Sequence, residues 1–266
     1  MKVDAARCWV SLQVIRREAP LVQNITNFVS MDVVANGLLA LGASPAMVHA
    51  KEEVVDFAEI ARALAINIGT LTPPWVDSMT EAVEAMSAKG KPWVLDPVGV
   101  GATTYRTKVA SDLAAMKPSV IRANASEILA LAGAALGPTK GVDSTHGSEE
   151  AVEVADQLAK RLGTVVAVTG AIDYVTDGER RLRVKNGHPM MTRVTALGCL
   201  ASSVVAAFLA VDEDPLNAAA EALAVYGLAA EQAAAKASGP GSLRWLLLDH
   251  LASLDEAAVI DGVRLE

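Results

Sequence analysis

Short apolar runs alternate along the chain with longer stretches whose apolar positions recur at helical spacing. A nearly continuous apolar run is typical of a parallel strand that is covered on both faces. The alternation predicts an α/β fold with one doubly wound, mostly parallel sheet and right-handed crossovers. The predicted strands are residues 46–49, 65–68, 93–95, 119–121 and 165–168, and the amphipathic stretches between them are residues 53–64, 75–89, 105–116 and 147–162.

The last third of the chain departs from this alternation. Asp177-Gly178 separates two short strand-like runs within residues 172–185, which predicts a β-hairpin. Beyond it, the pattern predicts a buried helix at 199–210 and then two alanine-rich helices. No linker, shift in composition or internal repeat divides the chain, so we expect one domain over residues 1–266.

Composition and charge exclude several classes of protein. The 266 residues carry 23 Lys and Arg against 31 Asp and Glu, and this net charge of −8 leaves no basic surplus for a nucleic-acid backbone. An apolar content of 52% excludes a disordered chain. The nearly uncharged run 194–211 is interrupted by Thr195, Gly198, Ser202 and Ser203. It therefore predicts a buried core helix rather than a membrane span.

Cysteine usage indicates the compartment. Cys8 and Cys199 lie far apart and lack the spacing of a metal site. Charged residues interrupt the apolar positions near the N-terminus, which is typical of a surface helix rather than of a signal peptide. Together these features indicate a reducing environment and predict a cytoplasmic protein.

The residues that follow each predicted strand are the candidates for chemistry, because doubly wound sheets bind ligands beyond the carboxyl ends of their strands. Asp96 follows one strand and leads into a loop that contains Gly99 and Gly101. A carboxylate beside a glycine-rich loop suits a metal ion and phosphate groups, although Asp96 could equally cap the next helix. The chain has neither the dinucleotide-binding nor the P-loop glycine motif.

The next two strands end in further polar residues. Asn124 and Glu127 have the spacing of a capping box at the start of a helix. Capping does not account for Arg122, whose guanidinium, one loop away from a carboxylate, suits nucleotide phosphates with a divalent cation. Thr169 offers a hydroxyl to a ligand, but Thr-Gly is also ordinary turn chemistry.

The predicted buried helix begins beside Gly198 and Cys199. The free amides and the positive dipole end of a helix N-terminus form an anion site. In that position we expect the pKa of Cys199 to be lowered. The alternative is that Cys199 is a small buried apolar residue, which is the commoner case for an isolated cysteine.

Amide side chains gather early in the chain, at Gln23, Asn24 and Asn27, and Met47 follows them. Uncharged amides and a soft thioether suit a small, neutral, heteroaromatic ligand. For the nearby His49 we expect a structural role.

Five segments of the chain resemble the hydroxyethylthiazole kinase family. They follow one another in the family's order and are spread over most of the chain. The resemblance implies a three-layer ribokinase-like α/β fold, with a mostly parallel central sheet and helices on both faces, and a homotrimer with active sites at the subunit interfaces. The matching segments are PLVQNITNFVSMDVVANGLLALGASPAMVHA at 20–50, LDPVGVGATTYR at 95–106, IRANASEILALAG at 121–133, VAVTGAIDYVTDG at 166–178 and VTALGCLASSVVAAF at 194–208.

The resemblance also implies a reaction, the ATP-dependent phosphorylation of the hydroxyl of 4-methyl-5-(2-hydroxyethyl)thiazole in thiamine salvage. Electrostatics and positioning should dominate phosphoryl transfer, so we expect Cys199→Ala to slow turnover modestly and Arg122→Ala or Glu127→Ala to slow it far more. The implied site residues are Met47, Ala196 and Asn24 for the thiazole, Arg122, Thr169 and Gly198 for ATP, Asp96 and Glu127 for Mg²⁺, and Cys199 for catalysis.

Two alternatives stay open, and one departure from the family pattern supports the second of them. Many members carry Gly-Thr-Gly-Cys where this chain has Ala196-Leu197-Gly198-Cys199. The chain could instead be a kinase of the same fold for a hydroxymethylpyrimidine or a similar vitamin alcohol. It could also be a non-catalytic protein that binds a vitamin precursor, although such a protein has little use for a site that holds a metal and a triphosphate.

Overall fold

The computed structural model describes residues 3–136 and 149–266. Its centre is an eight-stranded sheet with the order β2-β1-β3-β4-β5-β6-β7-β8. Neighbouring strands from β2 to β6 are parallel, β7 is antiparallel to β6, and β8 is antiparallel to β7. The strands are β1 Leu21–Ile25, β2 Ser44–Met47, β3 Ala63–Asn67, β4 Trp93–Asp96, β5 Val120–Asn124, β6 Val165–Thr169, β7 Asp173–Thr176 and β8 Arg181–Val184.

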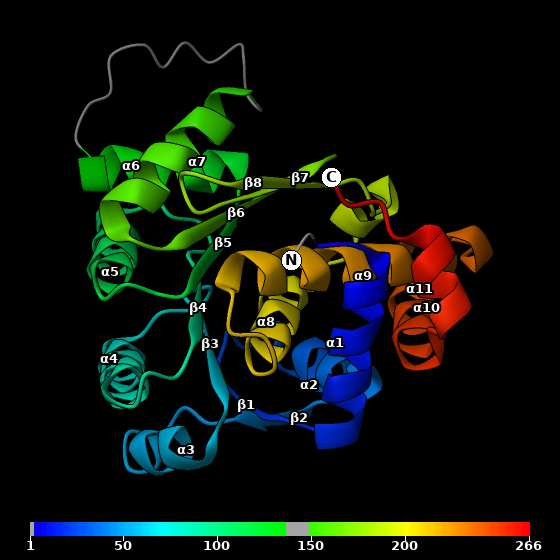
Figure 1. Ribbon diagram of the computed structural model, residues 1–266. Helices are drawn as coiled ribbons and strands as arrows, with labels where there is room; N and C mark the ends of the chain where they lie inside the picture. Colours follow the sequence, from blue (N-terminus) through cyan, green and yellow to red (C-terminus); the bar gives the residue numbers. More distant parts are fainter. Residues whose placement is uncertain (1–2, 137–148) are drawn as a thin grey trace.

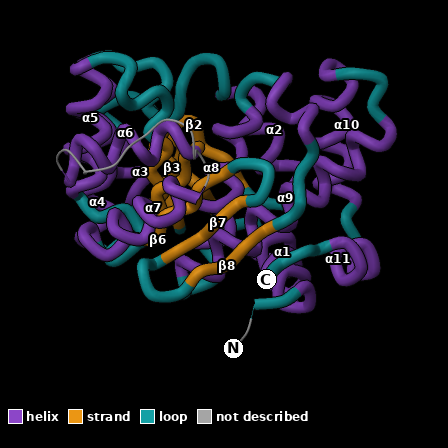
Figure 2. The backbone as a smooth tube through the Cα atoms, turned by 90° about the horizontal axis from the view of Figure 1, so that it is seen from above, coloured by secondary structure: helices purple, strands orange, loops and turns teal. Residues whose placement is uncertain are grey.

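Helices cover both faces of the sheet, so the protein has the three layers of a ribokinase-like fold (Figure 1). Helices α3 to α7 lie on one side, and α1, α2, α8, α9 and α10 lie on the other. The view in Figure 2 shows the strands enclosed between the two layers. The helices are α1 Ala5–Glu18, α2 Met31–Leu41, α3 Val54–Ile60, α4 Pro73–Ala88, α5 Thr104–Ala115, α6 Ala125–Leu136, α7 Glu149–Leu162, α8 Leu197–Leu209, α9 Pro215–Lys236, α10 Pro240–Ser253 and α11 Glu256–Gly262, with a 3₁₀ turn at Pro189–Arg193.

The parallel sheet, the hairpin and the late helices are confirmed, with differences at particular elements. The first strand, β1, is absent from the predicted set, because Gln23 and Asn24 interrupt its apolar run. The strand predicted at 65–68 begins two residues earlier, and the helix before it ends at Ile60. Residues 147–148 of one predicted helix lie outside the described residues.

Helix α8 is the buried helix that the apolar run predicted. Nearly every residue of its span is buried, and it packs on α9, on α2 and on the central strands β3 and β4. Among residues 3–136 and 149–266, no helix is both long enough and apolar enough to span a membrane. Close packing accounts for the run of Ala and Ser, since small side chains let α8 lie directly against the sheet.

The strand register gathers polar residues at one edge. Asn67 at the end of β3 lies opposite Asp96 at the end of β4, and Asn124 of β5 lies opposite Thr169 of β6. Strands β1 and β3 are neighbours, yet the helices that follow them, α2 and α4, lie on opposite faces of the sheet. A crevice at such a reversal of strand order is where this class of fold binds ligands.

Candidate functional site

Asp96 is the most deeply buried charged group of this edge. Its side chain is 1% exposed, and burial raises the pKa of its carboxyl to about 6. Asn67 Nδ2 and Ser202 Oγ both donate to its Oδ2, at 2.7 and 2.9 Å. Its Oδ1 has no hydrogen-bond partner within the described part of the chain. One carboxylate oxygen is therefore held in place, and the other is left for a ligand.

Glu127 joins the glycine-rich loop to the start of α6. Its two carboxylate oxygens accept from the backbone N–H of Gly99 at 2.9 Å and of Asn124 at 3.0 Å. Asn124 Oδ1 in turn accepts from the N–H of Glu127, so the predicted capping box is confirmed. Gly99 has a φ of 69° and Gly101 a φ of 91°, which is the left-handed region that favours glycine. The pKa of Asp96 is lowered by the charge of Arg122 and raised by that of Glu127, and both effects are smaller than that of burial.

Arg122 contacts two other residues of the predicted ATP site, Thr169 and Gly198. Its Nη2 donates to Thr169 Oγ1 at 2.6 Å, and its Nη1 donates to the carbonyl of Gly198 at 3.1 Å. A Cβ on Gly198 would lie 3.1 Å from Nη1, so this glycine permits the close approach of the guanidinium. The Nε of Arg122 is buried and has no hydrogen-bond partner among the described residues. The guanidinium therefore lies between β5, β6 and the first turn of α8.

The first turn of α8 holds Cys199, and here one expectation is wrong. The pKa of the Cys199 thiol is raised, not lowered, chiefly because the side chain is buried and secondly because Asp96 is negatively charged. Asn27 Nδ2 lies 3.3 Å from Sγ and donates to it, but this contact and the charge of Arg122 are the weaker effects. Loss of water from a thiolate outweighs the partial charge of a helix terminus.

The residues predicted to bind the thiazole lie at the ends of β1 and β2 and at the start of α8. Asn24 is fully buried, donates to the carbonyl of Val22 and accepts from Ser203 Oγ at 2.9 Å, so it ties β1 to α8. Met47 is half-buried at the end of β2, opposite Asn24, and packs against the same apolar cluster as Ala196. The role of these three residues toward a thiazole ring stays a prediction. His49 interacts with the backbone of Thr26, which agrees with its expected structural role.

Two partners of the site were missed by sequence reasoning. Asn67, like Asp96, is a polar residue at the end of an apolar strand, so the rule that selected Asp96 could also have selected Asn67. In the sequence, Ser202 is visible only as a polar residue that interrupts the apolar run 194–211. Its position on the inner face of α8 is decided by packing, and the sequence carries no signal for it.

Comparison with known proteins decides the family. The family model described as "Hydroxyethylthiazole kinase family" matches residues 12–257. The chain belongs to the hydroxyethylthiazole kinase family. This is the family that the five sequence segments indicated.

Relatives of the family cover almost the whole chain. A hydroxyethylthiazole kinase of Cereibacter sphaeroides (strain ATCC 17029 / ATH 2.4.9) is 56% identical over 97% of this chain and 98% of its own. A hydroxyethylthiazole kinase of Arabidopsis thaliana is 50% identical over 97% of this chain and 94% of its own. The solved structure of a hydroxyethylthiazole kinase protein from Pyrococcus horikoshii OT3 is 43% identical, with a TM-score of 0.90 over 98% of each chain. A pyridoxal kinase from Staphylococcus aureus, solved with AMP-PCP and pyridoxal, shares the fold at 16% identity and a TM-score of 0.59, covering 80% of this chain and 88% of its own.

Ala196 is where this chain departs from the glycine that many family members carry. It is the N-cap of α8, has a φ of 69° and makes no side-chain capping bond. An alanine in the left-handed region is strained by its Cβ, whereas glycine is not. Ala196 thus holds at the start of α8 a backbone conformation that glycine would adopt without strain.

We expect Ala196→Gly to stabilise the fold by about 0.5–1 kcal/mol, since strain relief exceeds the added freedom of the unfolded chain. Urea unfolding of both proteins measures the difference. Ala210→Gly is the matched control, because Ala210 ends the same helix at a φ of −67°, and there glycine should destabilise. A lower stability of Ala196→Gly would show that the left-handed alanine is not strained.

Proposed function

We propose that this chain transfers the γ-phosphoryl group of ATP to the primary alcohol of 4-methyl-5-(2-hydroxyethyl)thiazole. Family membership supports the activity, and the junction of Arg122 with Thr169 and Gly198 is the observation that carries it at the level of the site. This junction puts a guanidinium at the N-terminus of α8, where free backbone amides favour an anion. A transferred phosphoryl group fits between them.

ATP is proposed to bind with its phosphates at Arg122, Thr169 and Gly198. Arg122 supplies the fixed positive charge. Its Nε has no hydrogen-bond partner among the described residues, so this N–H could donate to a phosphate oxygen. The amides at Gly198 and Cys199 would stabilise the charge that develops on the transferred group, because they are already oriented by α8.

Mg²⁺ is proposed to be held by Asp96 and Glu127. Among the described residues there is no cluster of three or more His, Cys, Asp or Glu suited to a metal, so these carboxylates would share the ion with phosphate oxygens and water. The free Oδ1 of Asp96 fits such a hard cation. When bound, Mg²⁺ neutralises charge on the phosphates. Glu127 would also keep the glycine-rich loop in place through Gly99.

Cys199 is proposed to act on the acceptor side of the site without being a strong base. Its raised pKa keeps the thiol protonated at neutral pH, which suits positioning better than proton abstraction. Met47, Ala196 and Asn24 are proposed to surround the thiazole ring. Of these, Asn24 would act by holding β1 against α8, since its amide is already engaged.

The test is ATP consumption with Mg²⁺ and three acceptor conditions: hydroxyethylthiazole, hydroxymethylpyrimidine and no acceptor. We expect turnover that depends on the thiazole. Turnover with the pyrimidine alone would assign the chain to a neighbouring vitamin kinase activity. Thiazole binding without turnover would indicate a binding protein.

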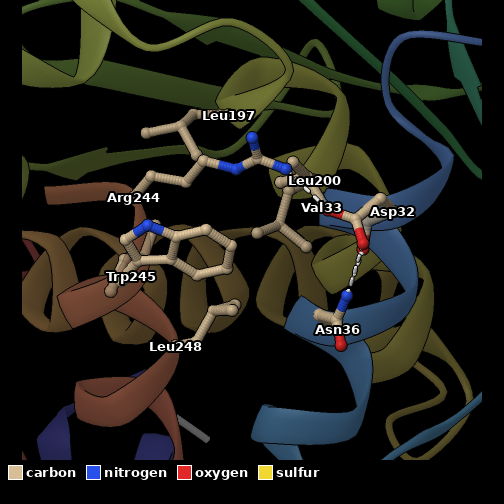
Figure 3. A pocket seen from close by; sticks show the side chains of 9 residues that line it. Asp32, Val33, Asn36, Leu197, Leu200, Arg244, Trp245 and Leu248 are labelled. Carbon is tan, nitrogen blue, oxygen red and sulfur yellow. Dashed lines mark hydrogen bonds and ion pairs between the residues drawn. The ribbon is translucent and has the colours of Figure 1, made fainter. Parts of the chain in front are cut away.

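A homotrimer with active sites at subunit interfaces is also proposed. Large apolar side chains are exposed on α2, on its entry loop and on α10, including Phe28, Leu39 and Trp245. Figure 3 shows Trp245 and Arg244 beside Leu197 and Leu200 of α8, with Arg244 paired to Asp32 of α2 at 2.6 Å. This surface adjoins the N-terminus of α8, where a second subunit would complete the site.

Light scattering in solution checks the assembly. The expected mass is three times that of the 27.6 kDa chain. A monomeric mass with full thiazole-dependent activity would contradict the trimer and leave the kinase proposal intact. We propose the reducing cytoplasm as the compartment, with which the free Cys8 and Cys199 agree.

A further inference from the structure

Four polar side chains form one continuous chain of hydrogen bonds across the carboxyl edge of the sheet. Asn27 Nδ2 donates both to Cys199 Sγ at 3.3 Å and to Asn67 Oδ1 at 2.8 Å. Asn67 Nδ2 then donates to Asp96 Oδ2 at 2.7 Å. Asn27, Asn67 and Asp96 are 5%, 4% and 1% exposed. The series thus links the loop after β1, the ends of β3 and β4, and the first turn of α8.

The backbone fixes the direction of these bonds. Asn27 Oδ1 accepts from the N–H of Val29 and of Ser30, at 3.1 and 3.0 Å, and Asn67 Oδ1 accepts from the N–H of Gly69 at 2.9 Å. A backbone N–H can only donate, so each amide must present its oxygen to the backbone and its NH₂ group to the site. Neither amide can be flipped without leaving a buried donor facing a donor.

Gly69 shows that Asn27 is also held by packing. A Cβ on Gly69 would lie 2.7 Å from Asn27 Nδ2 and 2.8 Å from its Cβ and Cγ. The φ of Gly69 lies outside the left-handed region, so the glycine is required there by space and not by backbone conformation. The side chain of Asn27 is thus confined on one side by the backbone of the β3 loop and on the other by its hydrogen bonds.

We propose that Asn27 and Asn67 are positioning residues for phosphoryl transfer, forming an amide bridge that fixes Cys199 and Asp96 relative to one another. The bridge rests on the proposed kinase function. Asn67 holds Asp96 by Oδ2 and leaves Oδ1 turned to the ligand, and Asn27 holds the thiol at the start of α8. Positioning of this kind matters because a loose phosphoryl-transfer transition state depends on fixed charges and on geometry.

Asn27→Ser and Asn67→Ser test the two arms of the bridge. Serine can still accept from the backbone N–H two residues on, so the turns are kept, but its hydroxyl is too short to reach Sγ or Oδ2. We expect each variant to lower kcat about tenfold, the effect of one hydrogen bond to a charged or reacting group, with KM for ATP and thiazole within about twofold.

Double-mutant cycles with Cys199→Ala separate the arms. In the Cys199→Ala background, the kcat loss caused by Asn27→Ser should shrink to about threefold or less, because the atom it positions is gone. Most of the loss caused by Asn67→Ser should persist, because the hydrogen bond from Asn67 to Asp96 Oδ2 does not involve the thiol. Equal persistence of both losses would indicate general loosening and overturn the bridge.

Gly69→Ala disturbs the position of the Asn27 side chain without changing residue 27 itself. The added methyl should displace Asn27 and reproduce its kcat loss. In the Asn27→Ser background the two losses should not add, because the Nδ2 group that Gly69→Ala displaces is already absent. Gly133→Ala is the matched control: Gly133 lies in α6 with nothing within 4 Å of an added Cβ, and kcat should not change.

Thermal unfolding supplies a readout that does not depend on activity. The Tm loss of the Asn27→Ser/Asn67→Ser double variant should be smaller than the sum of the single losses, since the two share one hydrogen bond. Wild-type protein without thiazole-dependent turnover would defeat the proposed function. Wild-type turnover with unchanged kcat in both serine variants would defeat the amide bridge alone.

Discussion

Asp96→Asn is expected to lower kcat at least about 1000-fold while leaving the fold as stable as before or more stable. The loss in rate follows because Oδ1 of Asp96 is the one free carboxylate oxygen among the described residues of the site. In asparagine the side chain is neutral and binds a cation poorly. The gain in stability follows from burial. Raising the pKa of Asp96 to about 6 means that its ionised form destabilises the folded state by about 3 kcal/mol.

The sign of the pH dependence tests this argument. The unfolded carboxyl has a pKa near 3.8 and the folded one about 6, so the folded state holds the proton more tightly. Stability is therefore lost as pH rises from about 4 through 6, and it stays lower above that range. Urea unfolding at pH 5 and pH 8 should show a larger loss for the wild type than for Asp96→Asn. Asp173, whose pKa burial also raises to about 6, contributes equally to both proteins.

An exposed carboxylate gives the control. Asp112 on α5 pairs with Lys108 at the surface, so Asp112→Asn changes the same charge without touching the site. It should leave kcat unchanged and stability within about 0.5 kcal/mol. An Asp96→Asn protein that keeps a tenth of the wild-type kcat, or that unfolds at lower urea at pH 8, would contradict the role given to Asp96.

Arg122→Lys is expected to lower kcat/KM for ATP about 100-fold, although the positive charge is kept. The guanidinium reaches Thr169 Oγ1 and the Gly198 carbonyl at once and still carries a buried N–H for the ligand. An ammonium group cannot occupy these directions in a fixed plane. Steady-state kinetics at varied ATP, with thermal unfolding alongside, measures the effect.

Arg183→Lys is the matched control, because Arg183 on β8 is half-exposed and lies outside the proposed site. It should change neither kcat nor KM. If Arg122→Lys retained full kcat/KM, a positive charge alone would suffice at this position, and the role given to the planar guanidinium would be wrong.

The sequence alone groups Asp96, Arg122 and Thr169, because the carboxyl ends of parallel strands meet at one edge of a sheet. Arg122 is the clearest of them, since capping explains Asn124 and Glu127 but not an arginine. The same reasoning does not find β1, whose Gln23 and Asn24 break the apolar pattern although both are buried. A hydrophobic pattern reports burial only where the buried side chains are apolar.

By itself the sequence determined the alternation of strands and helices, the hairpin at Asp177-Gly178, the buried character of α8 and, through five segments, the family. These follow from local spacing, which is a property of neighbours along the chain. Only the tertiary structure decided that the pKa of Cys199 is raised, that Ser202 and Asn67 hold Asp96, and that Gly69 makes room for Asn27. Burial and contact between residues distant in sequence depend on how the layers pack, and no local pattern records that packing.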